Sequence, residues 1–168
     1  IPKTIQKLKS DLNLKIPSKR IEAFDVSHLG GTNTVASMVS FINAKPRKTN
    51  YRKYNIKSTE KIDDFASIRE VVSRRYTRLK KEKSKFPDLI LIDGGKGQYS
   101  VSREILNELG LHDLPILAVA KGKRRNSGEE KIYHNNKEYI LSKNDPLLFF
   151  IQRLRDEAHR FAVSTHRA

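Results

Sequence analysis

Hydrophobic residues in the first third of the chain fall into three short runs, at residues 21–26, 34–42 and 48–56. Glycine or proline lies between the runs, and in the third run hydrophobic residues recur at Tyr51, Tyr54 and Ile56. Such runs, bounded by turn residues, are typical of β-strands, and we predict an antiparallel meander of three strands. Before them, a polar, lysine-rich segment predicts a helix over residues 4–12 and then a linker, so that residues 1–19 precede a domain at residues 20–168.

The spacing of hydrophobic residues becomes helical over residues 63–83. One stripe, opposite a face of arginine and lysine, is formed by Phe65, Ile68, Val72, Tyr76 and Leu79. This pattern predicts an amphipathic helix with Asp63 as its N-cap. A continuous apolar run at 89–92, a predicted helix over 98–109 and a second apolar run at 115–120 follow. The order strand, helix, strand is typical of a parallel crossover.

The last part of the chain predicts a hairpin and a long helix. Residues 131–141 turn at Asn135 and Asn136, and the helix over 146–165 starts with Asp145 as N-cap and Pro146 at its first position. Three antiparallel strands, a helix, and then alternating strands and helices is the order of the ribonuclease H-like fold. The expected fold class is therefore α/β: a ribonuclease H-like mixed five-stranded sheet flanked by helices, with an additional hairpin.

The composition indicates a class of binding partner for this fold. The chain has 34 Lys and Arg against 19 Asp and Glu, a formal net charge of +15 and a pI of about 10.1. Such a surface attracts polyanions, since each neutralised phosphate releases counterions. Nucleic acid is the leading partner, although a ribosome-associated or merely soluble basic protein has a similar charge.

Two absences narrow the chemistry further. Without cysteine there are no disulfides, thiolate metal sites or cysteine nucleophiles, so a metal site has to be built from Asp, Glu and His. The sequence has no apolar run of about 18 residues and no charged-then-apolar leader. We therefore expect a cytoplasmic protein that is not bound to a membrane.

Two aspartates on predicted strands are candidates for a ligand site. Asp25 lies in the first predicted strand, on the same face as Ala23 and Ser27. Asp93 ends a buried strand, at the edge where open α/β sheets bind ligands. Each has a structural alternative, as the cap of a turn or as part of a plain strand-to-helix turn. The glycines after Asp93 and the charge of Lys96 also suit a nucleotide, but the loop is shorter than a P-loop and lacks its Lys-Ser/Thr ending.

A histidine on the last predicted helix adds a third candidate. His159 belongs to a polar strip with Gln152, Arg155 and Asp156. A single histidine there is usually a surface residue, but Asp25, Asp93 and His159 together form an oxygen and nitrogen set that suits Mg²⁺ or Mn²⁺. Metal-dependent hydrolysis of a phosphodiester needs converging carboxylates of this kind. Asp64, in the first turn of the helix over 63–83, is a further catalytic candidate, with a role at the helix N-terminus as its alternative.

Basic residues gather on the third predicted strand, on the helix over 63–83 and in the later loops. We expect contacts with the DNA backbone from Arg52, Lys53, Lys57, Arg74, Arg75, Arg78, Lys96, Lys121, Lys123, Arg124 and Arg160. Phosphate contacts position a duplex without reading its sequence. Tyr51 and Tyr54 are candidates for stacking on an exposed base, with core residues as an equal alternative on an alternating strand.

Several stretches of the sequence are similar to a known family. They include IEAFDVSH at 21–28, YRKYNIK at 51–57, LIDGGKGQ at 91–98 and RDEAHRFA at 155–162. In this order they resemble the C-terminal endonuclease domain of the UvrC subunit of the bacterial nucleotide excision repair nuclease. The resemblance runs from about residue 20 to the end of the chain.

The resemblance implies a ribonuclease H-like, divalent-metal-dependent endonuclease that cuts 5′ of a lesion in damaged double-stranded DNA. The metal-binding triad of the family falls on Asp25, Asp93 and His159, and a further acidic position implicated in the 5′ cut falls on Asp64. The family protein also carries a nuclease domain for the 3′ cut, a segment that binds UvrB and helix-hairpin-helix repeats. We expect the contact with UvrB to use those regions, outside this chain.

Two other classes of function remain alternatives. One is a non-catalytic DNA-binding or scaffold domain of the same fold, in which the carboxylates are structural. The other is a transposase or Holliday-junction resolvase, which shares the fold and the acidic cluster. Preference among DNA shapes separates these classes, because resolvases act on four-way junctions.

Overall fold

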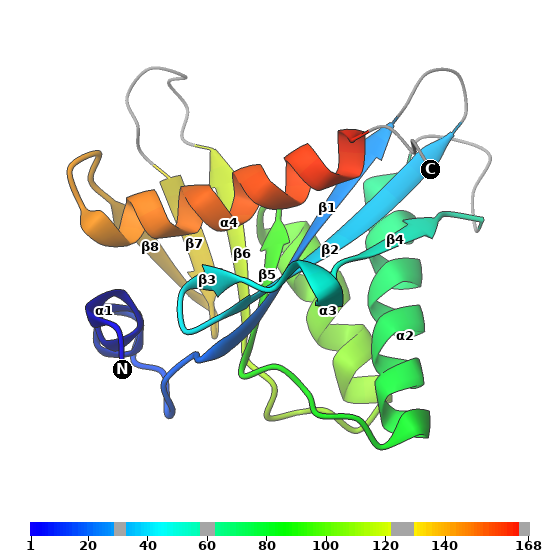
Figure 1. Ribbon diagram of the computed structural model, residues 1–168, viewed down its shortest axis with the longest axis horizontal. Helices are drawn as coiled ribbons and strands as arrows, with labels where there is room; N and C mark the ends of the chain where they lie inside the picture. Colours follow the sequence, from blue (N-terminus) through cyan, green and yellow to red (C-terminus); the bar gives the residue numbers. More distant parts are fainter. Residues whose placement is uncertain (29–32, 58–62, 122–129, 165–168) are drawn as a thin grey trace.

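The computed structural model describes residues 1–28, 33–57, 63–121 and 130–164 (Figure 1). Within these residues the chain forms one mixed eight-stranded sheet and four α-helices. The strands are β1 (Arg20–His28), β2 (Thr34–Ile42), β3 (Lys45–Pro46), β4 (Arg52–Asn55), β5 (Leu89–Asp93), β6 (Ile116–Lys121), β7 (Glu130–His134) and β8 (Lys137–Leu141). Their order is β3-β2-β1-β5-β6-β7-β8, and β4 pairs with β2.

The expected α/β class, a mixed sheet flanked by helices, is confirmed, but the sheet has eight strands where five strands and an additional hairpin were predicted. β1, β5 and β6 are parallel neighbours at the centre, and the other pairs are antiparallel. The predicted hairpin turns at Asn135 and Asn136, which both have positive φ as a tight two-residue turn requires. It is not a separate addition, because β7 pairs with β6 and buries Ile132 in the core, so the hairpin extends the sheet.

The third predicted strand is shorter than expected. Residues Lys48–Asn50 form a 3₁₀ turn, η1, and only Arg52–Asn55 pair with β2. The turn is closed by hydrogen bonds from the amides of Asn50 and Tyr51 to the carbonyls of Arg47 and Lys48. Tyr51 is a core residue whose ring meets Phe161 edge to face, with centroids 5.0 Å apart. The core alternative is therefore the correct one for Tyr51.

Helices cover both faces of the sheet (Figure 1). On one face lie α1 (Lys3–Asp11) and α4 (Pro146–Val163), and on the other lie α2 (Asp64–Glu82) and α3 (Lys96–Glu108). The predicted caps are present: Asp63 accepts from the amide of Ala66, and Asp145 accepts from the amide of Leu147. α1 buries Ile5 and Leu8 completely, so the segment before Arg20 packs against the domain.

Two hydrophobic cores result, one on each side of the sheet. Alternation along β1 sends Ala23 to the core under α4 and Phe24 to the core under α2 and α3. Because β1, β5 and β6 run in parallel, their carboxyl ends share one edge, and this edge carries the candidate residues. Among the described helices, none has the length and apolar character needed to cross a bilayer.

Candidate functional site

Asp25 is a buried carboxylate near the carboxyl end of β1. It is 4% exposed and shares the α4 face of the sheet with Ala23, as the alternation predicts. Its Oδ2 accepts a hydrogen bond of 2.6 Å from the hydroxyl of Ser27, two residues on along the same face. A carboxylate held this way has a fixed position but retains acceptor capacity for a ligand.

Asp93 lies on the neighbouring strand at the same height. The parallel register pairs Phe24 with Ile92, so the next residue on each strand is Asp25 and Asp93. Leu89 and Leu91 belong to the core under α4, which places Asp93 on the same face as Asp25. The structure therefore brings the two predicted carboxylates together at the sheet edge.

Burial, and after it the neighbouring carboxylate, changes the acidity of Asp93. Burial, and after it the negative charge of Asp25, raises the pKa of the Asp93 carboxyl from 3.8 to about 6. The positive charges of Arg155 and Lys121 act in the opposite direction without cancelling the effect. Two carboxylates with little water between them repel each other, and a divalent cation at this place relieves that repulsion.

His159 reaches the pair from α4, which crosses the face of the sheet in Figure 1. Its Nδ1 lies 3.4 Å from Oδ2 of Asp25, while its side chain is 62% exposed. The helix is fixed beside it because the hydroxyl of Ser37 on β2 donates to the carbonyl of Ala158 at 2.7 Å. One side of the imidazole thus meets the buried carboxylate, and the rest of the ring faces solvent.

A buried ion pair supports the site from behind. Arg155, one turn before His159 on α4, donates twice to Glu130 at the start of β7, at 2.9 Å each. Burial lowers the pKa of Arg155, but the hydrogen bonds and charge of Glu130 raise it more, so the guanidinium stays charged. This pair joins the hairpin to α4 and places a fixed positive charge near Asp93.

Asp64 has a different surrounding from the other three candidates. It lies in the first turn of α2, is 54% exposed, and has its Oδ1 3.0 Å from Nε2 of His28. The other ring nitrogen of His28 lies 3.0 Å from the hydroxyl of Thr34. His28 faces the α2 side of β1, so the structure joins Asp64 to His28 and not to the Asp25–Asp93 pair.

The turn after Asp93 is tight and depends on its glycines. Gly94 has φ of +146°, where an L side chain is strained, and α3 begins at Lys96, two residues before the predicted start. The earlier start follows from a hydrogen bond of 2.9 Å from the amide of Gly95 to the side chain of Gln98. A Cβ on Gly97 would lie 2.6 Å from the ring of Phe65, which therefore packs directly on the α3 backbone.

The donor set can be tested against a divalent metal ion. Within the described residues, no group of three His, Asp and Glu side chains is close enough to hold a metal by itself. Mg²⁺ commonly takes one or two carboxylates and completes its shell with water and substrate phosphates. A repelling pair of carboxylates with a nearby imidazole fits that pattern, so the residues present suit such an ion with DNA as a further source of oxygen.

Most of the predicted DNA contacts lie on the surface, but three of them are in ion pairs with glutamates: Arg74 with Glu70, Arg78 with Glu82 and Arg160 with Glu157. Of the predicted DNA contacts, seven are exposed: Arg52, Lys57, Arg74, Arg78, Lys96, Lys121 and Arg160. Lys53 is half-buried and donates to Ser164, which ties β4 to the end of α4. Lys123 and Arg124 lie outside the described residues.

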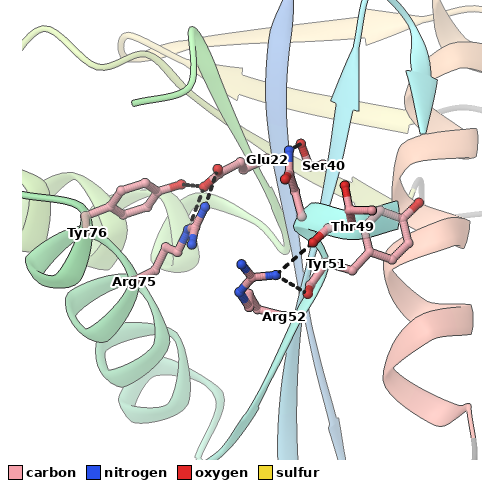
Figure 2. A network of polar contacts seen from close by, with 8 residues as sticks. Glu22, Ser40, Thr49, Tyr51, Arg52, Arg75 and Tyr76 are labelled. Atoms are coloured by element: carbon pink, nitrogen blue, oxygen red, sulfur yellow. Dashed lines mark hydrogen bonds and ion pairs between the residues drawn. The ribbon is translucent and has the colours of Figure 1, made fainter. Parts of the chain in front are cut away.

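Arg75 is a correction to the predicted surface. Figure 2 shows its guanidinium turned inward from α2 onto Glu22 of β1, with two hydrogen bonds of 3.1 and 2.8 Å. The residue is 9% exposed, so it supports the core and does not contact DNA. Arg75 lies three residues after Val72 and four before Leu79, so helical spacing puts it on the buried stripe and Arg74 outside it. Its partner Glu22 lies 53 residues away in the chain.

Sequence reasoning did not identify two polar groups of the site edge, Ser27 and His28. Both lie in the stretch 21–28, where their alternation on the two faces of the strand was readable. Ser27 donates to Asp25 on the same strand. His28 pairs with Asp64 on α2, which lies 36 residues away in the chain. No local pattern gives such a pairing.

Comparison with known proteins assigns this domain to a family. A family model described as the UvrC RNAse H endonuclease domain matches residues 9–163. UvrABC system protein C of Pseudomonas fluorescens (strain SBW25) is 47% identical over 94% of this chain, and the protein of the same name from Ruegeria sp. (strain TM1040) is 46% identical over 99% of it. The chain spans about a quarter of each relative, 26% and 27%.

Solved structures agree on the fold. Human ENDOV superposes on 88% of this chain and 87% of its own with a TM-score of 0.54, at 14% sequence identity. The catalytic domain of human Endonuclease V gives a TM-score of 0.50 over 88% of this chain and 79% of its own, at 18% identity. At these identities the likeness concerns the arrangement of the elements.

Proposed function

The chain belongs to the UvrC RNase H endonuclease domain family, and we propose that it is a hydrolase that cuts a DNA phosphodiester 5′ of a lesion during nucleotide excision repair. The observation that carries this proposal is the pair formed by Asp25 and Asp93 at the carboxyl edge of the sheet. Two mostly buried carboxylates side by side destabilise a folded protein, because burial and the charge of Asp25 raise the pKa of Asp93. Such an arrangement therefore indicates a function. Phosphodiester hydrolysis uses such a pair directly.

We propose Mg²⁺ or Mn²⁺ as the cofactor, held by Asp25, Asp93 and His159. The ion, when bound, activates the attacking water and stabilises the leaving oxygen of the phosphodiester. Asp25 is positioned for this role by Ser27, and Asp93 by the end of β5. The carboxylates gain a counter-charge on binding, which removes the repulsion that they have without it.

Besides binding the metal, His159 can transfer a proton during hydrolysis of the phosphodiester. Its Nδ1 is next to Asp25, an arrangement that fixes the orientation of the ring. The other nitrogen, Nε2, then serves to complete the ligand set or to move a proton to or from the reacting oxygen. Asp64, held by His28 on the other side of the edge, is included as the further acidic residue of the 5′ cut.

We propose that damaged double-stranded DNA is held mainly by its phosphates, through the exposed basic residues around the edge. The seven exposed predicted contacts come from several elements: β4, the segment after it, α2, α3, β6 and α4. Lys96 lies three residues after Asp93, and the charge of Lys121 acts on Asp93. Contacts of this kind set position without base specificity. UvrB is the proposed protein partner, through regions outside this chain.

The experiment is an incision assay with the full-length protein and its partner subunits on DNA that carries one bulky adduct. Asp25→Asn and Asp93→Asn should each lower the 5′ cut by at least about 100-fold, because the metal loses a charged ligand. The 3′ cut, proposed to come from a different domain, serves as the internal control for loading and folding. Equal 5′ cutting by wild type and both variants would refute the assignment and favour a DNA-binding scaffold.

A further inference from the structure

A groove of about 280 Å³ lies between the start of α3 and the β7–β8 hairpin. Lys96 and Ser100 line it from α3, and Tyr133, Asn136 and Lys137 line it from the hairpin. Its volume is near the lower end of the range for small-ligand pockets, about 300 Å³. A space of this size suits one nucleotide and is too small for a folded partner.

The walls of the groove are held in place by hydrogen bonds and packing. The hydroxyl of Tyr99 on α3 accepts a hydrogen bond of 3.0 Å from the amide of Asn135 at the hairpin turn. The ring of Tyr133 is half-buried and packs against the core under α2 and α3. Because Tyr133 keeps part of its surface in the groove while its other side is fixed, it forms a firm aromatic wall.

Two lysine side chains lie near the ring of Tyr133. The ammonium of Lys96 lies 5.9 Å from the centre of the Tyr133 ring, and Lys137 follows the turn of the hairpin. Within the described part of the chain neither lysine has a carboxylate within ion-pair distance, while the one acid of the groove, Glu138, is paired with Lys131 at 3.3 Å. The groove therefore presents an aromatic surface and two available cations, which is the pair of features that a nucleotide requires.

The groove lies on the α2 and α3 face of the sheet, and the turn after Asp93 connects it to the carboxylate pair on the α4 face. Register places Tyr133 opposite Ala118 on β6, and Ala118 opposite Ile92, the residue before Asp93. A Cβ on Gly95 would lie 3.8 Å from the Tyr133 ring, so the turn after Asp93 touches the groove directly. A DNA strand that passes the carboxylates reaches the groove by crossing the edge of the sheet over this turn.

We propose that this groove holds one nucleotide of the DNA strand that crosses the site, with its base stacked on Tyr133 and its phosphate bound by Lys96 and Lys137. The proposal rests on the proposed function, since it assumes that a DNA strand reaches Asp93. It adds a base contact to an interface that otherwise consists of backbone contacts. Stacking of this kind is tolerant of sequence, because every base has an aromatic face.

The test is a titration of the ¹⁵N-labelled 168-residue chain with two oligonucleotides in EDTA, so that no cutting occurs. One is a short thymidine strand and the other is an abasic strand of the same length. We expect amide shifts at Ser100, Asn136 and Lys137 with the thymidine strand, and about tenfold weaker binding of the abasic strand. Tyr133→Ala should abolish this difference, while Tyr133→Phe, which keeps the ring, should retain it.

Substitution of the lysines separates the phosphate contact from the base contact. Lys96→Ala and Lys137→Ala should weaken both strands equally and each reduce the dependence of log K on log salt by about one unit. Lys143→Ala, an exposed lysine beyond β8, is the matched control and should change neither. Equal binding of the two strands by wild type, or shifts elsewhere that leave the groove residues unmoved, would overturn the proposal.

The outcome is independent of the catalytic assignment. Binding in EDTA does not use the metal, so loss of the 5′ cut in Asp25→Asn says nothing about the groove, and loss of base-dependent binding in Tyr133→Ala says nothing about Asp25. If a poly-glutamate peptide shifts the groove amides and the thymidine strand does not, the occupant is an acidic peptide and the nucleotide proposal is wrong.

Discussion

Glu22 and Asp25 lie three residues apart on β1, exposed by 1% and 4%, and they face opposite sides of the sheet. Glu22 points toward α2, where Arg75 donates to it twice and the hydroxyl of Tyr76 donates a third hydrogen bond of 2.8 Å (Figure 2). Its negative charge is matched by a guanidinium inside the protein. Burial together with the nearby Glu22 charge and hydrogen bond raises the pKa of Tyr76, so this hydroxyl stays a donor.

Asp25 is as well buried but is not matched in the same way. It has one short hydrogen bond, from Ser27, and a histidine at 3.4 Å, and it faces a second carboxylate. Arg155 on α4, whose positive charge acts on Asp93, is already bound by Glu130. Burial therefore does not distinguish a structural carboxylate from a functional one, but the set of partners does. The charge of Glu22 is neutralised inside the protein, whereas Asp25 can still bind a cation.

The largest effect on stability is expected at Glu22. Glu22→Ala leaves Arg75 buried with no counter-charge, and we expect the free energy of unfolding to fall by about 3–5 kcal/mol. Urea denaturation followed by circular dichroism measures the change. The triple variant Glu22→Leu, Arg75→Met, Tyr76→Phe removes the whole polar group and should recover most of the loss. A cost below about 1 kcal/mol for Glu22→Ala would show that the pair is not structural.

Replacement of Asp93 is expected to raise the free energy of unfolding, the opposite of the change at Glu22. The pKa of its carboxyl is raised from 3.8 to about 6, so the folded state binds a proton more tightly than the unfolded state in this window. Stability is therefore lost as pH rises from about 4 to about 6, and the cost is fully present at pH 7. Asp93→Asn removes that cost and should stabilise the chain by about 1–3 kcal/mol at pH 7, and the gain should shrink as pH falls from about 6 to about 4.

Denaturation of wild type and Asp93→Asn at pH 4, 5.5 and 7 measures this difference. Asp113→Asn, a second aspartate whose side chain lies in a surface loop before β6, is the matched control and should show no such pH dependence. A variant that is less stable than wild type at pH 7 would contradict the repulsion between Asp25 and Asp93.

The smallest effect on stability is expected at His159. Its side chain is mostly exposed, so His159→Ala should change the free energy of unfolding by less than about 0.5 kcal/mol. The 5′ cut should nevertheless fall by about 100-fold or more, the size expected for a lost proton-transfer group or ligand. Incision and denaturation measured on the same preparation compare the two. Unchanged incision would remove His159 from the site and leave the carboxylate pair alone.

The sequence predicted the order of elements because most of them carry a local signal. The apolar stripe of α2 and the cap at Asp63 are readable within one helix, and the Asn135–Asn136 turn is readable within one hairpin. The extension of the sheet by β7 was not readable, since it depends on pairing with β6 across residues 122–129. The short length of β4 was missed because Tyr51, Tyr54 and Ile56 look like one strand with the residues before them, whereas Lys48–Asn50 form a 3₁₀ turn.

The site was predictable to a similar extent. Alternation on β1 and the strand end at Asp93 placed two carboxylates, and the family resemblance joined them to His159. The ion pairs Glu22–Arg75 and Glu130–Arg155 were not predictable, because each joins residues at least 25 positions apart. The same long separation hid the pairing of Asp64 with His28. Long-range partners therefore decide which charged residue is structural, and a single sequence does not contain them in readable form.

The most direct measurement is an anomalous difference map from a crystal of this chain soaked in Mn²⁺, with a soaked Asp25→Asn crystal as its control. The account predicts a peak between the carboxylates of Asp25 and Asp93, with His159 beside it, and loss of the peak in the variant. A well-ordered structure in which Asp25 and Asp93 point away from each other, or a peak that persists unchanged in Asp25→Asn, would contradict it.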